Sequence, residues 1–572
     1  MRTSRAFDYV IVGAGSAGCV LASRLSADPG NSVLLLEAGG AENRYWRMRM
    51  PLAWRDTFMD PRVDWGYSSE PEPFADHRRI PVPRGKVLGG CSSVNGMMYS
   101  RGHAPDYDQW RELGLPGWSY AEVLPYFRRA EANWRGESLY HGATGPLTVS
   151  PHLTDARLYP SLIATAEKLG YRHLDDFHGA AIEGFSAPDF NVHRGQRAST
   201  AARYLRPVMG RRNLVVETGA LVYRILFDGD HAVGVEYERG GEIVQVHADR
   251  EVLLAAGAFN SPQLLLLSGV GPASDLQALG IAPLRDLPGV GGNLQDHQSA
   301  GAIFKARGPI TFESQLRLDR LALSVVRWML SGSGPIADLP VAAQGFLKLR
   351  ATTRGADIQF LVSPVSMGAR SWFPGWRKGA GHVFSVANVL LHPESRGRVT
   401  LRSTHPADPP RILFNLLHSP VDRETLRETL RFCRKFFATP PAAELVSQEI
   451  LPGPGVASDA ELDAHIRRTV GTAMHPAGTC AMGTDSHAVV DAQLRVHGLR
   501  GLRVIDASVM PTIIGGNTNA PVIMIAEKAA DMILGRPALQ PAELASESQR
   551  DRDGAGRVHA PQSALTPAPP IQ

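Results

Sequence analysis

A glycine-rich turn near the N-terminus constrains the fold of this chain more than any other feature of the sequence. Gly13, Gly15 and Gly18 form a GxGxxG pattern. The pattern follows an apolar run over residues 8–12, typical of a buried parallel strand, and it precedes a helical stretch over residues 19–28. A strand, a tight glycine turn and a helix in this order predict the start of a Rossmann-like α/β unit.

Each part of this unit has a physical role in holding a dinucleotide. Gly13 permits the tight turn, Gly15 lets a pyrophosphate approach the backbone, and Gly18 lets the helix pack closely on the strand. A second apolar run over residues 33–36 ends at Glu37, where a carboxylate can accept hydrogen bonds from ribose hydroxyls. The pattern alone does not distinguish FAD from NAD, but Glu37 disfavours the 2′-phosphate of NADP.

Strand patterns of the same apolar kind recur far along the chain. Residues 251–259 read as a strand, residues 502–511 read as a strand and turn, and residues 519–534 read as a helix. Between them, residues 382–391 and 397–403 alternate apolar and polar side chains as antiparallel strands do. We therefore expect an α/β protein, in which a discontinuous Rossmann-like domain carries an inserted α+β substrate domain on an antiparallel or mixed sheet.

These segments also predict the domain boundaries and the tail. The last residues are rich in Pro, Ala, Ser and Gln and poor in large apolar side chains, which predicts disorder. The expected ranges are 1–155, 200–304 and 466–538 for the nucleotide-binding domain, 156–199 and 305–465 for the substrate domain, and 539–572 for the disordered tail.

Composition and charge exclude several classes of protein. Lys and Arg total 60 against 56 Asp and Glu, and because no long basic run occurs we expect no nucleic-acid partner. The four cysteines form no CxxC pair, so we expect neither a disulfide scaffold nor a metal site. We expect no transmembrane segment, because no long apolar stretch occurs, and in the absence of a signal sequence the simplest location is the cytoplasm.

Two further glycine-rich segments, residues 84–102 and 257–271, read as loops in which the backbone approaches a ligand closely. In the second segment, residues 261–269 read as a helix with Pro262 in its first turn. With the N-terminal pattern, they resemble the two signatures of the glucose-methanol-choline (GMC) oxidoreductases, in the branch of choline and alcohol dehydrogenases. Matching motifs extend over nearly the whole chain and include PRGKVLGGCSSVNG, GAFNSPQLLLLSGVG, PGVGGNLQDH and HPAGTCAMG. The resemblance implies FAD bound across the Rossmann-like domain, with the substrate domain capping the isoalloxazine ring.

The resemblance also implies which residues hold the cofactor. Some members of the family attach FAD covalently through a His at the position of Val94, so the valine predicts noncovalent FAD. Asn519 is a credible N-cap of the helix that follows it, with Pro521 in the first turn. The implied cofactor-binding residues are Gly13, Gly15, Ser16, Gly18, Glu37, Ala38, Gly90, Ser93, Asn95, Gly96, Val222, Ala256, Asp506, Ala507 and Asn519.

The implied chemistry is oxidation of a primary alcohol to an aldehyde by hydride transfer to the flavin. His475, in the HPAGTC motif, resembles the catalytic histidine of the family, and imidazole meets the need for a general base with little tuning of its pKa. Asn517 corresponds to a second family residue that hydrogen-bonds the substrate oxygen and stabilises a developing alkoxide. We interpret the neighbouring pair Asp296 and His297 as mostly structural.

The substrate is expected to be uncharged, because Gln298, Ser299 and Ala300 stand where choline-specific members tend to carry an acidic residue. The acceptor is a quinone-type carrier or oxygen, and a flavin-containing lyase or photodecarboxylase on the same fold is the alternative. A homo-oligomer and peripheral association with the inner membrane are compatible with the sequence.

The inserted aromatic residues either line an apolar pocket or, as we favour, belong to a core strand or loop: Phe360, Trp372, Phe373 and Trp376.

Overall fold

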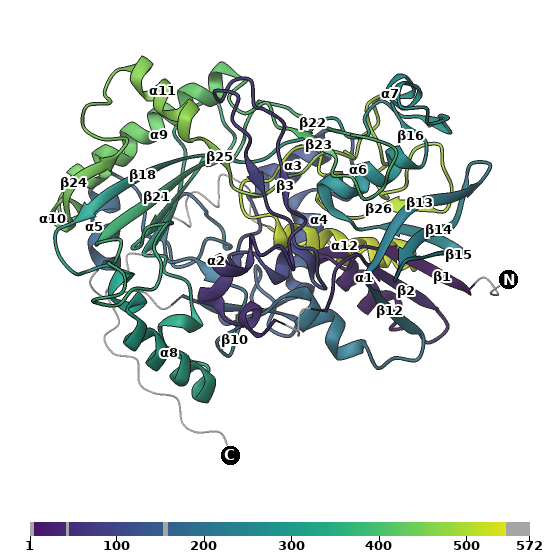
Figure 1. The fold of residues 1–572 in the computed structure, drawn as a ribbon, viewed down its shortest axis with the longest axis horizontal. Helices are drawn as coiled ribbons and strands as arrows, with labels where there is room; N and C mark the ends of the chain where they lie inside the picture. Colours follow the sequence, from purple (N-terminus) through teal and green to yellow (C-terminus); the bar gives the residue numbers. More distant parts are fainter. Residues whose placement is uncertain (1–4, 42–44, 153–157, 545–572) are drawn as a thin grey trace.

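The apolar runs around the glycine turn lie in the first of two large sheets, which occupy opposite ends of the molecule (Figure 1). This computed structural model describes residues 5–41, 45–152 and 158–544. The parallel part of the first sheet has the order β12–β2–β1–β15, and β26 pairs with the other edge of β15. An antiparallel pair, β14 and β13, extends the sheet beyond β15. The bounds are β1 Arg5–Val12, β2 Val33–Glu37, β12 Leu214–Thr218, β13 Ala220–Asp228, β14 His231–Arg239, β15 Glu242–Leu254 and β26 Leu502–Val504.

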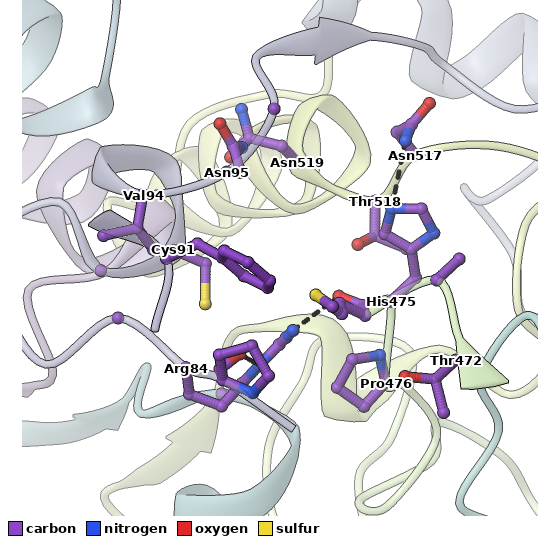
Figure 2. A pocket seen from close by; sticks show the side chains of 18 of the residues that line it. Arg84, Cys91, Val94, Asn95, Thr472, His475, Pro476, Asn517, Thr518 and Asn519 are labelled. Atoms are coloured by element: carbon purple, nitrogen blue, oxygen red, sulfur yellow. Dashed lines mark hydrogen bonds between the residues drawn. The ribbon is translucent and has the colours of Figure 1, made fainter. Parts of the chain in front are cut away.

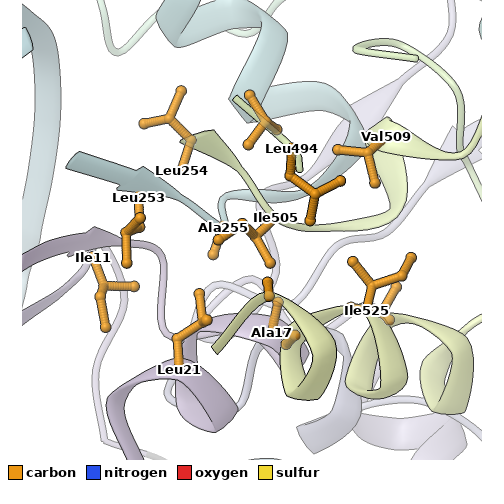
Figure 3. Packing of buried hydrophobic residues seen from close by; sticks show 14 of the residues in the cluster. Ile11, Ala17, Leu21, Leu253, Leu254, Ala255, Leu494, Ile505, Val509 and Ile525 are labelled. Atoms are coloured by element: carbon orange, nitrogen blue, oxygen red, sulfur yellow. The ribbon is translucent and has the colours of Figure 1, made fainter. Parts of the chain in front are cut away.

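Two helices cover the parallel strands and bury the core of this half. Helix α1 (Ser16–Leu25) follows the glycine turn, and α12 (Asn519–Ile533) lies beside it although the two are far apart in sequence. Figure 3 shows Leu21 of α1 and Ile525 of α12 packed against apolar side chains of the sheet, and both are fully buried. Burial of these apolar side chains stabilises the packing of α12 beside α1.

The second large sheet is antiparallel throughout and has the order β24–β18–β21–β20–β19–β8, with β25 pairing to β18. The predicted alternation over residues 382–391 corresponds to β21. Residues 397–403 contain β22, which is not part of this sheet and forms a separate two-stranded sheet with β23. The predicted fold class is thus confirmed. The bounds are β8 Gly184–Ser186, β18 Gln298–Ala306, β19 Ala343–Leu347, β20 Ile358–Ser363, β21 Val383–Leu390, β24 Val446–Leu451 and β25 Gly471–Thr472.

The remaining elements connect and cover the two sheets. The other helices are α2 Trp54–Thr57, α3 Ala104–Glu112, α4 Tyr120–Ala130, α5 Tyr159–Lys168, α6 Gly257–Leu267, α7 Ala273–Ala278, α8 Leu318–Ser331, α9 Pro420–Ala438, α10 Ala442–Leu445 and α11 Asp459–Thr469. The short strands are β3 Tyr67–Ser68, β4 Pro81–Val82, β5 Met98–Tyr99, β6 Glu131–Asn133, β7 Leu147–Pro151, β9 Asp189–Phe190, β10 Val192–His193, β11 Gln196–Arg197, β16 Val270–Gly271, β17 Arg285–Asp286, β22 Arg398–Thr400 and β23 Arg411–Leu413.

The segment around Pro262 differs from its prediction. The strand expected over residues 251–259 ends at Leu254, and α6 already begins at Gly257, so Pro262 lies inside the helix rather than in its first turn. A proline there has no N–H to donate to the carbonyl of Ala258. The hydroxyl of Thr479 donates to that carbonyl instead, at 2.6 Å, and this tertiary hydrogen bond explains how the helix tolerates the proline.

The described residues include residues from all three expected parts of the nucleotide-binding domain and only the start of the expected tail. The boundary expected at residue 304 falls inside β18, whose whole length pairs within the second sheet. Of the expected tail, residues 539–544 still meet the body, since the amide of Ala542 donates to the carbonyl of Ala121, while residues 545–572 lie outside the described part. Within the described ranges, no helix is both long enough and apolar enough to cross a bilayer.

Candidate active site

A cavity of about 800 Å³ lies between the two large sheets. At one end it is lined by Val12, Leu36 and Val222 of the first sheet, close to the glycine turn. At the other end it is lined by residues of the second sheet, including Gln359, together with the segment around His475. A cavity that joins the carboxyl ends of parallel strands to a second domain is the usual place for a ligand in α/β proteins.

The end of the cavity near the glycine turn is shaped by backbone rather than by side chains. A Cβ on Gly13 would lie 2.6 Å from the carbonyl oxygen of Ala255, and a Cβ on Gly90 would lie 2.8 Å from the Cα of Gly15. Both glycines also have a left-handed φ, +97° and +50°. These missing side chains leave a cradle of exposed peptide groups, which fits a pyrophosphate.

Glu37, the last residue of β2, lines this end of the cavity. Its two carboxylate oxygens accept hydrogen bonds from the amides of Ala14, at 3.0 Å, and Gly39, at 2.8 Å. Each oxygen retains a lone pair, so the side chain can still accept from a ribose hydroxyl. Burial raises the pKa of Glu37 to about 7, although the two amides and Lys86 act in the opposite direction.

Most of the predicted cofactor-binding residues line the cavity. Two of them do not, because Gly18 and Ser93 lie behind the lining. A Cβ on Gly18 would lie 1.9 Å from the carbonyl oxygen of Gly13, so this glycine serves helix–strand packing, and the Ser93 hydroxyl donates to the carbonyl of Leu88 at 2.7 Å. The lining residues are Gly13, Gly15, Ser16, Glu37, Ala38, Gly90, Asn95, Gly96, Val222, Ala256, Asp506, Ala507 and Asn519.

Two of these lining residues also connect distant segments. Asp506 accepts hydrogen bonds from the amide of Gly257, at 2.9 Å, and from the hydroxyl of Ser261, at 2.6 Å, so it ties β26 to the start of α6. Asn519 is the first residue of α12 rather than its N-cap, because Thr518 occupies the capping position. The Asn519 side chain accepts instead from the hydroxyl of Ser16 at 2.8 Å, which fastens the start of α12 to the start of α1.

The two predicted catalytic residues meet at the other end of the cavity. Nε2 of His475 and Nδ2 of Asn517 lie 3.1 Å apart, and both residues line the cavity. Figure 2 shows this hydrogen bond, with Cys91 and Val94 on the opposite side of the open space. Asp296 fixes the main chain of His475, because its carboxylate accepts the His475 amide at 2.8 Å.

A chain of hydrogen bonds decides which nitrogen of His475 carries the proton. Nε2 of His297 lies 3.0 Å from the carbonyl oxygen of Ile514, which can only accept, so His297 donates there. In neutral His297 the remaining nitrogen, Nδ1, is then an acceptor, and it lies 3.0 Å from Nδ1 of His475. His475 therefore donates through Nδ1 and presents an unprotonated Nε2 toward Asn517 and the cavity.

Electrostatics keep His475 neutral. Burial, reinforced by the positive charge of Arg84, lowers the pKa of His475 to about 3. The pKa of His297 is also lowered, again chiefly by burial, so both rings are neutral at physiological pH. The sequence suggested an imidazole that needs little tuning of its pKa, whereas the structure shows a strongly desolvated imidazole whose lone pair is available over a wide range of pH.

The Asp296–His297 pair contacts His475 directly. The sequence favoured a structural role for the pair. In the structure Asp296 accepts a hydrogen bond from the backbone amide of His475, and His297 contacts the ring of His475. The signal was present in the sequence as an acidic residue and a histidine side by side. It could not be used, because only the fold reveals that they face His475.

The four aromatic residues of the inserted segment do not line the cavity in the described structure. Phe360 is fully buried in the core of the second half, which agrees with the interpretation we favoured. The aromatic residues that do line the cavity come from the N-terminal half of the chain, and of these only Phe259 lies in a segment that the sequence analysis singled out: Trp54, Phe58, Trp65 and Phe259.

A glycine cradle facing the carboxyl ends of parallel strands, joined to a buried histidine under a second sheet, defines a nucleotide-dependent oxidoreductase. Comparisons with known proteins identify the class further. The family model of the GMC oxidoreductases matches residues 7–299 with its N-terminal part and residues 393–526 with its C-terminal part. This chain belongs to the GMC oxidoreductase family, and it is an FAD-dependent enzyme that acts on CH–OH groups.

Individual relatives agree with this assignment. The mitochondrial choline dehydrogenase of Mus musculus is 43% identical over 542 residues, which cover 93% of this chain and 90% of the mouse protein. The oxygen-dependent choline dehydrogenase of Photobacterium profundum is 43% identical over 539 residues, 94% of each chain. Among solved structures, pyridoxine 4-oxidase from Mesorbium loti has a TM-score of 0.83 at 32% identity, covering 93% of this chain and 100% of that one. Formate oxidase of Aspergillus oryzae has a TM-score of 0.87 at 28% identity, covering 93% and 99%.

Proposed function

We propose that this enzyme oxidises an uncharged primary alcohol to an aldehyde, with His475 as the general base. The observation that carries the proposal is the unprotonated Nε2 of His475, which points into the cavity and is held there from the opposite side of the ring by His297. Removal of the hydroxyl proton is what allows a hydride to leave the carbinol carbon. A positioned base contributes about 10²–10⁴-fold to the rate of such a step.

Asn517 complements the base. The low pKa of His475 keeps Nε2 free but also lowers its affinity for a proton, so negative charge on the substrate oxygen needs another donor. The Asn517 amide has two N–H groups and lies 3.1 Å from Nε2, so an alcohol oxygen placed next to both side chains can give its proton to the base and accept from the amide. Asn517 cannot itself act as a base at neutral pH.

The cofactor site follows from the cradle at the other end of the cavity. Gly13, Gly15 and the first turn of α1 would hold the pyrophosphate of FAD, and Glu37 would hold its ribose. Bound FAD supplies the acceptor for the hydride. Val94 lines the cavity with an aliphatic side chain that cannot form a covalent bond to the flavin, which supports noncovalent binding.

The charges around the cavity favour an uncharged alcohol over choline. Among the described residues that line it, the acidic ones are Glu37 and Asp506, and both belong to the nucleotide end. Ser299 lines the catalytic end, and the charge that acts on the pKa of His475 is that of Arg84, which is positive and also lines the cavity. A quaternary ammonium group is normally held by a carboxylate together with aromatic side chains. The described residues that line the catalytic end include no carboxylate, and the positive charge of Arg84 would oppose the cation there.

One experiment tests the reaction and its base together. Purified FAD-loaded enzyme is mixed anaerobically with a series of primary alcohols and with choline, and reduction of the flavin is followed by loss of its yellow absorbance. We expect neutral alcohols to reduce the flavin, and His475→Ala to slow the reduction by about 10²–10⁴-fold while retaining FAD. Ser299→Glu is expected to improve choline relative to neutral alcohols. Failure of every alcohol to reduce the flavin would refute the proposal.

The same experiment addresses the acceptor and the alternative. Rapid return of the absorbance on admitting air identifies oxygen as an acceptor, whereas return only with a quinone identifies a carrier. A flavin-containing lyase or photodecarboxylase is not favoured, because the relatives are dehydrogenases and oxidases by name. A cytoplasmic location with peripheral association at the inner membrane remains part of the proposal, as does a homo-oligomeric state.

A further inference from the structure

Helix α8 uses one face to join the protein and leaves another apolar face uncovered. Its inner side chains include Leu321, Val325 and Trp328, which pack in one cluster with Met50 and Ile336. In Figure 1 the helix projects from the lower edge of the molecule, away from both large sheets. This inner contact fixes the orientation of the helix, so its other face is presented to solvent.

The outer face carries apolar side chains in each of its turns, beside the exposed charged residues Asp319, Arg320 and Arg327. Leu323, Met329 and Leu330 are 71%, 72% and 84% exposed, and Leu318 and Val326 are also exposed. Leu318, Val326 and Met329 follow the spacing of one helix face, and the two other leucines lie beside them. Single exposed apolar residues are ordinary, but a contiguous group on a projecting helix marks a surface that meets an apolar partner.

A neighbouring loop extends this surface. The amide of Leu318 donates to the carbonyl of Trp372 at 2.9 Å, which holds residues 366–380 against the start of α8. This loop exposes Met367, Phe373 and Trp376, to 59%, 42% and 61%. Aromatic side chains with one wet edge are favoured where an apolar phase meets water.

The charges around this surface are almost all positive. Residues 314–334 and 366–380 contain Arg317, Arg320, Arg327, Arg370, Arg377 and Lys378 against a single acidic residue, Asp319. That aspartate is paired with Arg317. The whole chain, by contrast, has nearly equal numbers of the two signs, 60 and 56. The local excess of positive charge would attract an anionic surface.

We propose that α8 and residues 366–380 dock on the surface of a bilayer that contains anionic phospholipids. The outer apolar face of α8 enters the boundary between head groups and acyl chains, while the flanking arginines contact the head groups. A second copy of this chain fits less well, because two such surfaces would bring their positive charges together. The helix lies on the membrane and does not cross it, since its 14 residues are too few to span a bilayer.

Docking in this orientation would place an opening of the cavity against the lipid. Ser366, Met367 and Gly368 line the cavity, and Met367 belongs at the same time to the exposed surface. An apolar alcohol or a quinone-type acceptor dissolved in the bilayer would then reach the cavity without crossing water. This last step rests on the proposed oxidation of an alcohol. The docking surface deepens the proposed peripheral association with a membrane and does not depend on the reaction.

Vesicle binding tests the docking directly. Full-length FAD-loaded enzyme is floated with vesicles of phosphatidylcholine alone and with vesicles that also contain phosphatidylglycerol. We expect binding to the anionic vesicles, weakened by salt, and a loss of about tenfold or more in the variant Leu323→Glu/Leu330→Glu. The variant Arg320→Gln/Arg327→Gln is expected to lose the preference for anionic vesicles. The matched control is Ile243→Glu/Leu284→Glu, which changes two exposed apolar residues of the other half of the chain.

The remaining outcomes separate the alternatives. Equal binding by the Leu323→Glu/Leu330→Glu variant and the wild type, or no binding by the wild type, would overturn the proposal. Self-association that this variant abolishes, together with absence of vesicle binding, would assign the surface to a second copy instead. Oxidation of a water-soluble alcohol with a water-soluble dye is measured in parallel. The rate of this oxidation should be unchanged in the Leu323→Glu/Leu330→Glu variant. Absence of the oxidation in the wild type would count against the proposed function without affecting the docking.

Discussion

The two ends of the cavity are built in opposite ways. At the nucleotide end, side chains are missing where backbone must approach backbone or ligand, as at Gly13 and Gly18. At the catalytic end, side chains from distant segments meet, since His297 lies 178 residues before His475 and Asn517 lies 42 residues after it. The first end should therefore be sensitive to added atoms and the second to lost hydrogen bonds.

The largest effect is expected from an added atom at the nucleotide end. In Gly18→Ala, the new Cβ would lie 1.9 Å from the carbonyl oxygen of Gly13, which is a backbone atom and cannot move aside as the end of a flexible side chain could. We expect the variant to lose about 3 kcal/mol or more of stability and to be purified without FAD. Thermal unfolding and the yellow absorbance of the purified protein measure the two effects.

The control for this prediction is Gly40→Ala. A Cβ on Gly40 meets no atom within 4 Å, so this variant should retain both its stability and its FAD. A yellow Gly18→Ala protein as stable as Gly40→Ala would show that the close contact between α1 and the glycine turn is not what limits this end of the cavity.

The second prediction removes a hydrogen bond at the catalytic end. In His297→Ala, Nδ1 of His475 loses its acceptor, so the ring is no longer held in the tautomer that presents Nε2 to the substrate. We expect flavin reduction to slow by about 10–100-fold, with little change in the alcohol concentration that half-saturates the rate. Stopped-flow reduction over a range of alcohol concentrations separates the two quantities.

A conservative variant distinguishes positioning from a general loss of structure. In His297→Gln, the amide oxygen can accept from His475 while the amide nitrogen donates to the carbonyl of Ile514, as His297 does. This variant should recover part of the rate. If the glutamine and alanine variants were equally slow, the hydrogen bond to His475 would not be the cause.

The third prediction concerns pH and the charge of Arg84. Because only neutral His475 can act as a base and its pKa is lowered to about 3, protonation of His475 should not slow alcohol oxidation between pH 8 and pH 5. The variant Arg84→Met removes this positive charge, so protonated His475 becomes less unfavourable and the pKa of His475 should rise. The acidic limb of the plot of rate against pH should therefore move to higher pH. Arg84→Lys retains the charge and should move the limb less. A shift of the Arg84→Met limb to lower pH would contradict this account.

The sequence predicted the nucleotide end better than the catalytic end, for a physical reason. Strand, turn, helix and acid follow one another within residues 8–37, so local patterns suffice to place Gly13 and Glu37 in the cavity. His475 and Asn517 were found through family resemblance, because nothing in their own neighbourhoods shows that they meet. The contact between His297 and His475 was not anticipated, since it depends on pairing between β18 and β25, which brings the two segments together.

The remaining errors also come from tertiary contacts. Pro262 lies within α6 because Thr479, more than two hundred residues away, takes over the missing hydrogen bond. The exposed face of α8 was not anticipated, because an apolar helix in a sequence reads as a core helix until the fold shows what covers it.

The smallest expected effect tests a residue that was predicted to bind the cofactor and lies outside the cavity. Ser93 is buried and its hydroxyl donates to Leu88, whereas Ser16 lines the cavity and donates to Asn519. Ser93→Ala should cost about 1 kcal/mol of stability and leave FAD affinity unchanged, and Ser16→Ala should weaken FAD binding by about fivefold. Titration of the FAD-free variants with FAD, beside thermal unfolding, measures both. If Ser93→Ala weakened binding more than Ser16→Ala, the nucleotide end would depend on side chains behind the cradle, and the contrast with the catalytic end would be less sharp.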